Sequence, residues 1–506
     1  MNTGRCLSLA AVVLGAIVAS SLVGSIDVWG AAGSTPGMFF VTDYGAVGDG
    51  SHDDTAAFQA AIDAAAPTGG AVLVPPVGGG KGYVLTRTVT VKQSVALIGS
   101  LAGFSSNGWA AYSLPESHVK GAKIFARPSA KTSDEVRQPL FRLQGGNTVR
   151  GFWILYDKQP WPSDAEFKQI PYSYGSFDDA KKGFLRDYVK PYGPTFYVEF
   201  GDNTCIEDIL ADRYYDFFYL KAGAKVSINR ISLYGYRKAF TIEKSYDVNR
   251  LSNIEIVPNV GPSCLGACTW IYGIIVSQED NVGVQIGFSD GYTLTDLYFD
   301  ALHTGFRLGV SKDWPICDPV TGEVFDSPKE GNGPWGSMSN IGIDGCNIGL
   351  QFVWPGGMAT HISNLLVYPQ FDDRSHFPAS SGTGSLANVS RHAAFIFEST
   401  YTKGNDFGQL PTILLSNAEI ASNWPESGLA FGVGASMYKA NGRVFLVAGE
   451  ANVEIFGLVL SLVDDPSKLL IAAANTSGDV SIRVRGYVLN GAPLPDVRLT
   501  KYGVAP

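Results

Sequence analysis

Two hydrophobic patterns alternate along most of the chain. The first is a seven-residue phrase with apolar residues at its first, fourth and sixth positions, as in LTDLYFD (294–300) and MSNIGID (338–344). The second is a five-residue phrase in which alternate positions are apolar, as in GFRLG (305–309) and GLQFV (349–353). Alternation with a period of two is typical of a strand that turns one face inward. The pattern therefore predicts many short strands rather than helices.

The two phrases recur in the same order. The first phrase is found at residues 206–212, 228–234, 251–257, 294–300, 338–344, 362–368 and 415–421. The second phrase is assigned to residues 216–220, 239–243, 273–277, 305–309, 349–353, 394–398 and 428–432. Similar apolar runs at 443–447, 453–460 and 481–488 continue the pattern to the C-terminal end. A pair of strands that repeats in this way predicts a solenoid, in which each repeat packs on the next.

The spacing of the repeats predicts where loops are inserted. The step from Asp216 to Ala239 is 23 residues, about one turn of such a coil, whereas later steps are 32 to 45 residues. The extra residues are assigned to insertions at 153–195, 258–270, 311–337 and 369–392. Function on a repeat scaffold usually resides in such loops and in the surface they border.

The segment before the repeats has a different pattern. The run VTDYGAVGDGSHDDTAAFQAAIDAAA (41–66) places small and apolar residues at helical spacing after Asp54 and Thr55, either of which is a good N-cap. Short apolar runs bounded by Gly and Pro follow at residues 71–74, 83–85, 89–91 and 95–98, and they predict strands.

Residues 39–100 resemble the opening segment of the pectate lyase superfamily, which includes family 28-related glycoside hydrolases, epimerases and phage tailspikes. The resemblance implies a right-handed parallel β-helix whose N-terminal end is capped by this segment. We therefore expect an all-β chain that forms a single right-handed parallel β-helix with a short N-terminal capping helix. The resemblance is specific for the fold and not for the reaction. His52, Asp53 and Asp54 are expected to serve the cap and its turns rather than catalysis.

The chain is divided into three parts. Residues 1–32 carry Arg5, then an almost wholly apolar or small stretch from Leu7 to Gly24 and small residues up to Ala32, as in a secretory signal peptide. Residues 33–115 are assigned to the N-terminal cap and first rungs, and residues 116–506 to the parallel β-helix with long insertions. We expect a secreted protein, extracellular or periplasmic, without stable membrane association after cleavage. An uncleaved membrane anchor is the alternative.

Composition excludes several classes of protein. Hydrophobic residues make up 45% of the chain and charged residues 17%, so the chain is too apolar to be disordered. The formal net charge is -9, which argues against a nucleic-acid partner because phosphate binding needs clustered Lys and Arg. Five cysteines follow the signal segment, too few for a disulfide scaffold, although Cys264 and Cys268 could close a short loop. No metal site is predicted.

The repeat alignment predicts a pair of catalytic carboxylates. Asp300 and Asp344 occupy equivalent positions, and equivalent positions on adjacent rungs lie about 4.8 Å apart. Such a pair can act in glycoside hydrolysis, where one group protonates the leaving oxygen and the other attacks or activates water. Glu255 is a third catalytic candidate on a neighbouring rung, and Asp212 shares the column. The alternative is ordinary turn chemistry at strand ends; Asp290, Asp296 and His303 are weaker candidates.

Four further residues are candidates for binding substrate. Arg307 follows on the second strand of the Asp300 rung and could hold a carboxylate or a developing negative charge. Trp161, Trp314 and Trp335 lie in the insertions, where aromatic faces could stack on sugar rings. The alternative for these tryptophans is that they form the loops' own small cores.

These observations favour a secreted glycoside hydrolase that acts on a polysaccharide and needs no cofactor. One alternative is a lyase that cleaves a uronate polymer by β-elimination, with a base among Arg213, Lys221, Arg230 and Arg307, and with calcium as a cofactor. Another is a non-catalytic carbohydrate-binding surface protein. The chain lacks the motif sets of polygalacturonases and alginate epimerases, so no catalytic residue is carried over from either. A monomer or a homotrimer is expected.

Overall fold

The computed structural model describes a large part of the chain from Gly37 onward. The described residues are 37–78, 80–100, 121–131, 136–159, 177–257, 278–300, 302–327, 333–353, 358–369, 393–398, 412–421, 443–447, 451–461, 472–473, 480–489, 491–500 and 503–505. Residues Gly37–Pro506 form one compact unit. The predicted signal peptide (1–32) and the boundary proposed at residue 115 lie outside the described residues and stay predictions, as do any roles for Trp161, Cys264 and Cys268.

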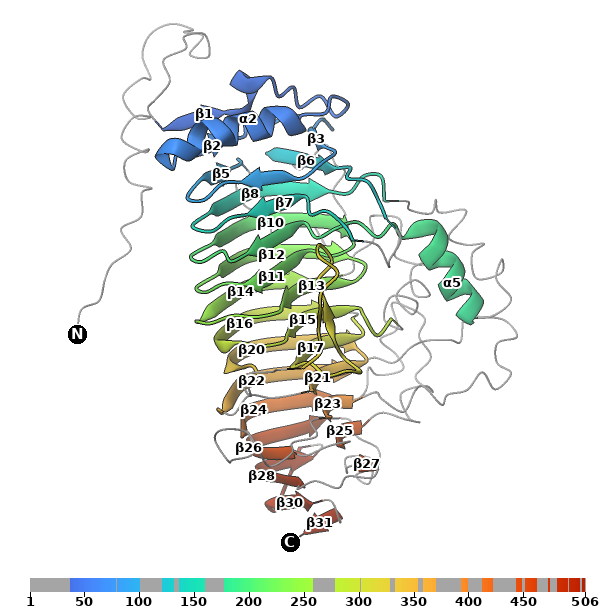
Figure 1. Cartoon of the computed structure of the whole chain (residues 1–506). Helices are drawn as coiled ribbons and strands as arrows, with labels where there is room; N and C mark the ends of the chain where they lie inside the picture. The colour runs from blue at the N-terminus through green and yellow to red at the C-terminus, as the bar shows by residue number, and fades with distance from the viewer. Residues whose placement is uncertain are drawn as a thin grey trace, which may run out of the picture. The chain divides into compact units, whose positions relative to one another are not determined.

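Two parallel sheets run the length of this unit (Figure 1). The long-strand sheet contains β8 (Thr148–Leu155), β10 (Cys205–Tyr214), β12 (Ser227–Gly235), β14 (Asn249–Ile256), β16 (Asp290–Asp300), β20 (Trp335–Cys346), β22 (Thr360–Pro369), β24 (Ile413–Ala421), β26 (Ala451–Ser461) and β28 (Val480–Leu489). The short-strand sheet contains β4 (Val89–Val91), β7 (Phe141–Leu143), β9 (Phe196–Glu199), β11 (Phe218–Ala222), β13 (Lys238–Ile242), β15 (Val282–Ile286), β17 (Thr304–Leu308), β21 (Ile348–Phe352), β23 (Ala393–Phe397), β25 (Arg443–Val447) and β27 (Ala472–Ala473).

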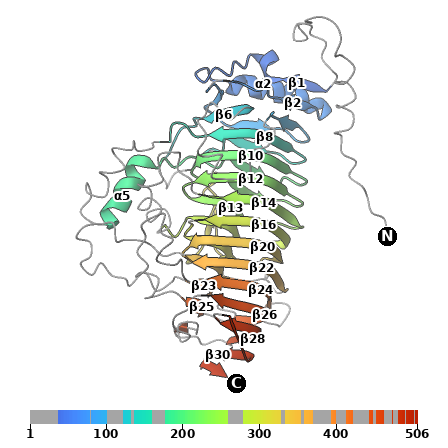
Figure 2. The same cartoon turned by 180° about the vertical axis from the view of Figure 1, so that it is seen from behind.

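The chain alternates between the two sheets, so that each turn of the coil adds one long and one short strand. From β8 to β28 each long strand pairs in parallel with the next, and so does each short strand. Figure 2 shows the same stacking from behind. This is the predicted right-handed parallel β-helix. Within the described residues, no helix is long and apolar enough to cross a membrane.

Each long strand bends at a residue with positive φ near its middle. The angle is 53° to 56° at Asn253, Asp296, Asn340, Asn364 and Asn417. Asn and Asp tolerate this left-handed conformation better than other non-glycine residues. The bend explains the first phrase: it puts an extra residue between two inward positions, so that Leu294 and Leu297 are both buried.

The side chains at these bends form a ladder. Asn340 Nδ2 donates to Asp296 Oδ1 at 2.9 Å, Asn364 Nδ2 to Asn340 Oδ1 at 2.9 Å, and Asn417 Nδ2 to Asn364 Oδ1 at 3.2 Å. Each bond links one rung to the next. Asp296 is therefore a structural residue of the bend.

The N-terminal cap forms as the sequence predicts. Helix α2 (Thr55–Ala65) follows Asp54 and packs its apolar side on the first strands, which include β1 (Met38–Phe40), β2 (Ala71–Leu73), β3 (Tyr83–Leu85), β5 (Ala96–Ile98) and β6 (Ala122–Ala126). The Asp54 carboxylate accepts hydrogen bonds from the backbone N–H groups of Val47, Gly48 and Val84. It therefore ties the turn before the helix to β3.

The C-terminal end closes differently. Strands β29 (Ala492–Leu494) and β30 (Val497–Thr500) pair antiparallel with β28, and β31 (Gly503–Ala505) pairs antiparallel with β30. The antiparallel strands cover the last edge of the coil, which would otherwise offer free backbone groups to another chain.

The structure corrects the sequence prediction in three places. The short strand after β14 is β15, at Val282–Ile286, so residues 273–277 were the wrong choice for this rung. The short strand after β24 is β25, at Arg443–Val447, and not residues 428–432. In both cases the sequence before the strand contains a second apolar run that has the same period. The first insertion also contains a helix that was not predicted, α5 (Phe177–Tyr188), which stands beside the strands (Figures 1 and 2).

Candidate functional site

The part of each long strand after its bend turns two positions outward. Five of these outward positions between β10 and β24 carry an acidic side chain: Asp212, Glu255, Asp300, Asp344 and Glu419. We call these five residues the carboxylate row. The other outward positions from Leu210 to Ala421 hold apolar, glycine, serine or tyrosine residues. The row is therefore an acidic strip along one face of the coil.

Asp300 and Asp344 are direct partners in the register of β16 and β20. Adjacent strands are about 4.8 Å apart, and both side chains are partly exposed at the ends of their strands. Glu255 on β14 is in register with Tyr298 on β16. The predicted juxtaposition of the two aspartates is thus confirmed, and Glu255 lies one strand away.

Tyr298 connects these carboxylates. Its hydroxyl donates to Asp344 Oδ2 at 3.1 Å, and its side chain is 41% exposed. The ring crosses to the next rung over Gly342, where a Cβ atom would stand 2.8 Å from ring atom Cδ2. The residue was missed in the sequence, although it lies at the other outward position of the same phrase as Asp300.

Burial raises the pKa values of three residues at this site. It raises the pKa of Asp344 above its ordinary value, although the hydrogen bonds from Tyr298 and from the Gly345 backbone N–H act in the opposite direction. Burial also raises the pKa of Glu255. The pKa of Tyr298 is raised by burial and then by the negative charges of Asp344, Asp300 and Glu255. Asp344 can therefore hold a proton at a higher pH than an ordinary aspartate, as a general acid must.

The outward column of the short-strand sheet has a different chemistry. Its members are Arg142, Tyr197, Tyr219, Thr241, Gln285, Arg307 and Gln351, in register from β7 to β21. Residues 309–327, which we call the roof segment, lie against this column with their hairpin of β18 (Ile316–Cys317) and β19 (Val324–Phe325). Tyr197 donates to Asp318 Oδ2 at 3.0 Å, and Lys221 Nζ lies 3.3 Å from Asp318 and 2.7 Å from Glu323.

Arg307 and Trp314 belong to this roofed face. Arg307 is only 2% exposed; it donates to Gln351 Oε1 at 2.7 Å and to the Glu279 carbonyl at 2.8 Å. The Trp314 ring lies 4.2 Å from the Arg307 guanidinium carbon and is itself buried. The structure therefore does not bring Arg307 to Asp300 and Asp344, because the turn after β16 carries the chain to the other sheet. Trp314 therefore packs within the roof segment, which is the alternative predicted for it.

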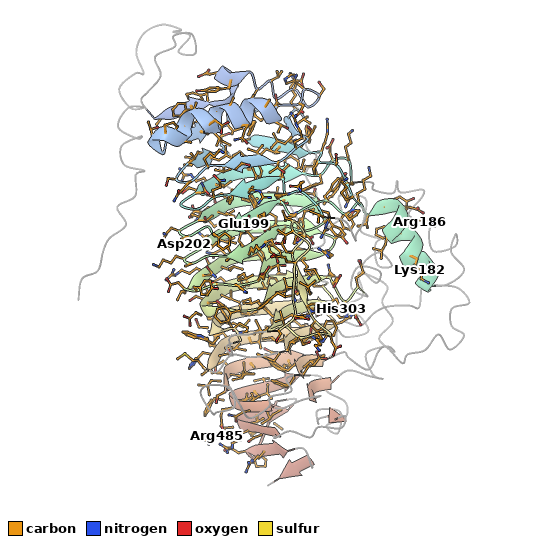
Figure 3. The ribbon with its side chains drawn as sticks, viewed as in Figure 1. Lys182, Arg186, Glu199, Asp202, His303 and Arg485 are labelled. Carbon is orange, nitrogen blue, oxygen red and sulfur yellow. The ribbon has the colours of Figure 1, made fainter. Side chains whose placement is uncertain are left out.

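The remaining candidates lie apart from the two aspartates. Trp335 begins β20, at the end of the strand opposite Asp344, and its Nε1 donates to Asp290 Oδ1 at 3.2 Å. His303 lies in the turn that leads to β17, where Nδ1 and Thr304 Oγ1 are 2.9 Å apart. Figure 3 shows His303 at the edge of the coil opposite Asp202. No catalytic role is assigned to Trp335, Asp290 or His303.

A buried group of charges lies where the chain enters the short strands. Asp216 pairs with Arg237 and, at 3.0 Å, with Arg137. Although burial alone would raise it, the pKa of Asp216 is lowered by these two arginines. Lys238 lies beside them, and burial together with the Arg237 charge lowers its pKa to about 8. The sequence analysis did not identify this group, because its members come from distant segments that only the coil brings together.

Two of the basic residues considered for elimination already have acidic partners. Arg230 bonds Asp208 at 2.6 and 2.8 Å, and the pKa of Arg230 is raised chiefly by that contact. Lys221 is held by Asp318 and Glu323. In the part of the chain that the structure describes, no group of three His, Cys, Asp or Glu side chains is arranged to hold a metal ion.

Comparison with known proteins supports the fold and not a particular reaction. Residues 38–133 match the family model described as "Rhamnogalacturonase A/epimerase, pectate lyase-like". The resemblance to the pectate lyase superfamily is thus confirmed. The match ends before β10 and so does not include the carboxylate row.

Two curated relatives each match a short stretch of the chain. Mannuronan C5-epimerase AlgE3 of Azotobacter vinelandii is 44% identical over 69 residues, 13% of this chain and 4% of that protein. AlgE5 of the same organism is 43% identical over 67 residues, 12% of this chain and 7% of that protein. The match therefore spans less than a tenth of either relative.

Solved structures similar to this chain include an exopolygalacturonase from Thermotoga maritima, with a TM-score of 0.43 and 9% identity over 92% of this chain and 94% of that chain. They also include PfbA, a surface adhesin of Streptococcus pneumoniae, with a TM-score of 0.39 and 13% identity over 92% of this chain and 99% of that chain. The similar structures thus include both an enzyme and an adhesin.

Proposed function

We propose that the protein is a glycoside hydrolase that cleaves a polysaccharide laid along the carboxylate row. The observation that carries this proposal is the direct register of Asp300 with Asp344. In this mechanism Asp344 protonates the glycosidic oxygen, and Asp300 acts as the carboxylate nucleophile. A spacing of about 5 Å between the two carboxyl groups suits a retaining enzyme, since an inverting enzyme needs more room for water.

The acidic character of the row selects among substrates. After the bends, five carboxylates occupy outward positions from β10 to β24, and the cation Arg213 follows Asp212 near the end of β10. A polyuronate carries a carboxylate on every sugar and would be repelled by this strip. The proposed substrate is therefore a neutral polysaccharide. The exposed ring of Tyr298 offers it an apolar surface for a sugar face.

The test uses the full chain with a panel of neutral and uronate polysaccharides. New reducing ends without ultraviolet absorbance of unsaturated sugars are expected from one or more neutral polymers. Proton NMR of the first products should show the anomer of the substrate. Cleavage that persists in both Asp300→Asn and Asp344→Asn would contradict the proposal, and so would inverted products.

Lys238 supports a second candidate function, β-elimination on a uronate. Its pKa is lowered to about 8, so that it can act as a base near neutral pH. Arg237, whose guanidinium is paired with Asp216, adds a positive charge beside it. The described carboxylates do not form a calcium site, so no calcium step is assigned to this cluster. Unsaturated products that disappear in Lys238→Met and persist in Asp344→Asn would favour elimination over hydrolysis.

A further inference from the structure

Tyr298 occupies the centre of the proposed site. Glu255 is its register partner on β14, Gly342 its partner on β20, and Asp300 lies two residues further along its own strand. Its hydroxyl donates to Asp344 Oδ2. Tyr298 thus contacts the carboxylate of the neighbouring rung.

Gly342 makes this contact geometrically feasible. The equivalent outward positions on neighbouring strands hold Ser232, Glu255 and Leu366, all of which have a Cβ atom. At Gly342 a Cβ would meet the Tyr298 ring at 2.8 Å, closer than carbon atoms can approach without movement. The glycine therefore lets the ring lie across the rung instead of projecting from the sheet.

We propose that Tyr298 is the positioning residue of the Asp300–Asp344 pair, with Gly342 admitting its ring. The hydroxyl holds one oxygen of Asp344, which leaves the other oxygen to carry the proton toward the glycosidic bond. The catalytic meaning of this contact rests on the proposed hydrolase function. The contact itself can be tested without turnover.

The groups around Asp344 allow the effect of the Tyr298 hydroxyl on the pKa of Asp344 to be measured separately. The titratable groups that face Asp344 or its neighbours from the packed strands are Glu255, Tyr298, Asp300, Cys346, Tyr368 and Glu419. All of them are acids, thiols or phenols. The hydrogen bond from Tyr298 stabilises the ionised form of Asp344, and its removal should therefore raise the pKa of Asp344 further.

The first experiment titrates the Asp344 carboxyl by carbon NMR in the full chain labelled at aspartate, with Asp344→Asn assigning its signal. In Tyr298→Phe the midpoint should rise by about one pH unit, the order expected for a lost hydrogen bond to a charged group. Tyr368→Phe is the matched control, because Tyr368 is also in register with Asp344. An unchanged midpoint in Tyr298→Phe, or an equal rise in the control, overturns the proposal.

The second variant, Gly342→Ala, displaces the ring and keeps its hydroxyl. It should raise the Asp344 midpoint as Tyr298→Phe does. In both variants the alkaline limb of the pH–rate profile should move upward by the same amount, and kcat should fall about tenfold with KM unchanged. Cleavage with an unmoved alkaline limb overturns the positioning role. Absence of cleavage by the natural sequence overturns the hydrolase proposal instead, and the titration still decides whether Tyr298 controls Asp344.

Discussion

The outward faces of the two sheets differ in what covers their polar residues. On the short-strand sheet the roof segment lies against the column, and charged groups such as Asp216 are paired and buried. On the long-strand sheet the carboxylate row is partly exposed. The first face contains charges that stabilise the fold. The second presents partly exposed acidic groups, among which burial raises the pKa values of Glu255 and Asp344; shifted pKa values of this kind are common at reactive sites.

The largest effect should appear when the row is neutralised. Asp300→Asn and Asp344→Asn should each lower kcat about 10²- to 10⁴-fold, the range for loss of an acid or base group. Measurement of reducing ends under saturating substrate checks this, and circular dichroism checks that the coil is intact. The matched variant Asp296→Asn, at the bend of the same strand, should keep nearly full activity, because Asn already occupies this place on neighbouring rungs. If kcat fell equally in Asp296→Asn, the loss could not be assigned to the carboxylate row.

The same chemical change on the roofed face should affect stability instead. Asp216→Asn leaves Arg137 and Arg237 buried without their carboxylate, which typically costs about 3–5 kcal/mol. Urea unfolding followed by circular dichroism measures this loss. Asp208→Asn breaks the more exposed pair with Arg230 and should cost less than about 1 kcal/mol. Similar losses of unfolding free energy in the two variants would show that burial does not determine how much each ion pair contributes to stability.

The attachment of the roof segment can be tested by removing its cation. Lys221→Met leaves the fully buried Asp318 without that partner and should cost about 1–3 kcal/mol. Amide hydrogen exchange should accelerate in residues 309–327, with little change in β16 and β20. Exchange that rises equally in both places would mean that the roof and the coil unfold together.

The smallest effect concerns the stability of the row itself. Asp344 keeps its proton to a higher pH in the folded chain than in the unfolded chain, so its contribution to stability falls as the pH rises from about 4 toward the folded pKa. Asp344→Asn should therefore stabilise the protein by less than about 1 kcal/mol at neutral pH and leave it unchanged below pH of about 4.

Acid should affect the roofed face in the opposite sense. The folded pKa of Asp216 lies below its unfolded value, so its stabilising contribution is present above pH of about 4 and is lost as the pH falls through the folded pKa. Thermal melts across pH check both signs. A neutral-pH destabilisation by Asp344→Asn would indicate that the row, too, serves the fold.

Most of the coil could be predicted because its rules are local. The period-two phrases locate the strands, and the turn and helix residues after Val41 locate the cap, so β10, β12, β16, β20 and α2 fall where the pattern puts them. The prediction failed at β15 and β25, where a long insertion contains a second apolar run of the same period. Local pattern cannot choose between two such runs, because the choice depends on which one meets the neighbouring short strand.

The sequence by itself determined the repeat, and with it the adjacency of Asp300 and Asp344, because equivalent positions of a parallel coil must stack. Only the tertiary structure decided which sheet each functional candidate faces. It separated Arg307 from the carboxylates, laid Tyr298 over Gly342, and brought Asp216 to Arg137. These contacts depend on how far a side chain reaches across a rung and on where an insertion folds back. The period of the sequence determines neither of these.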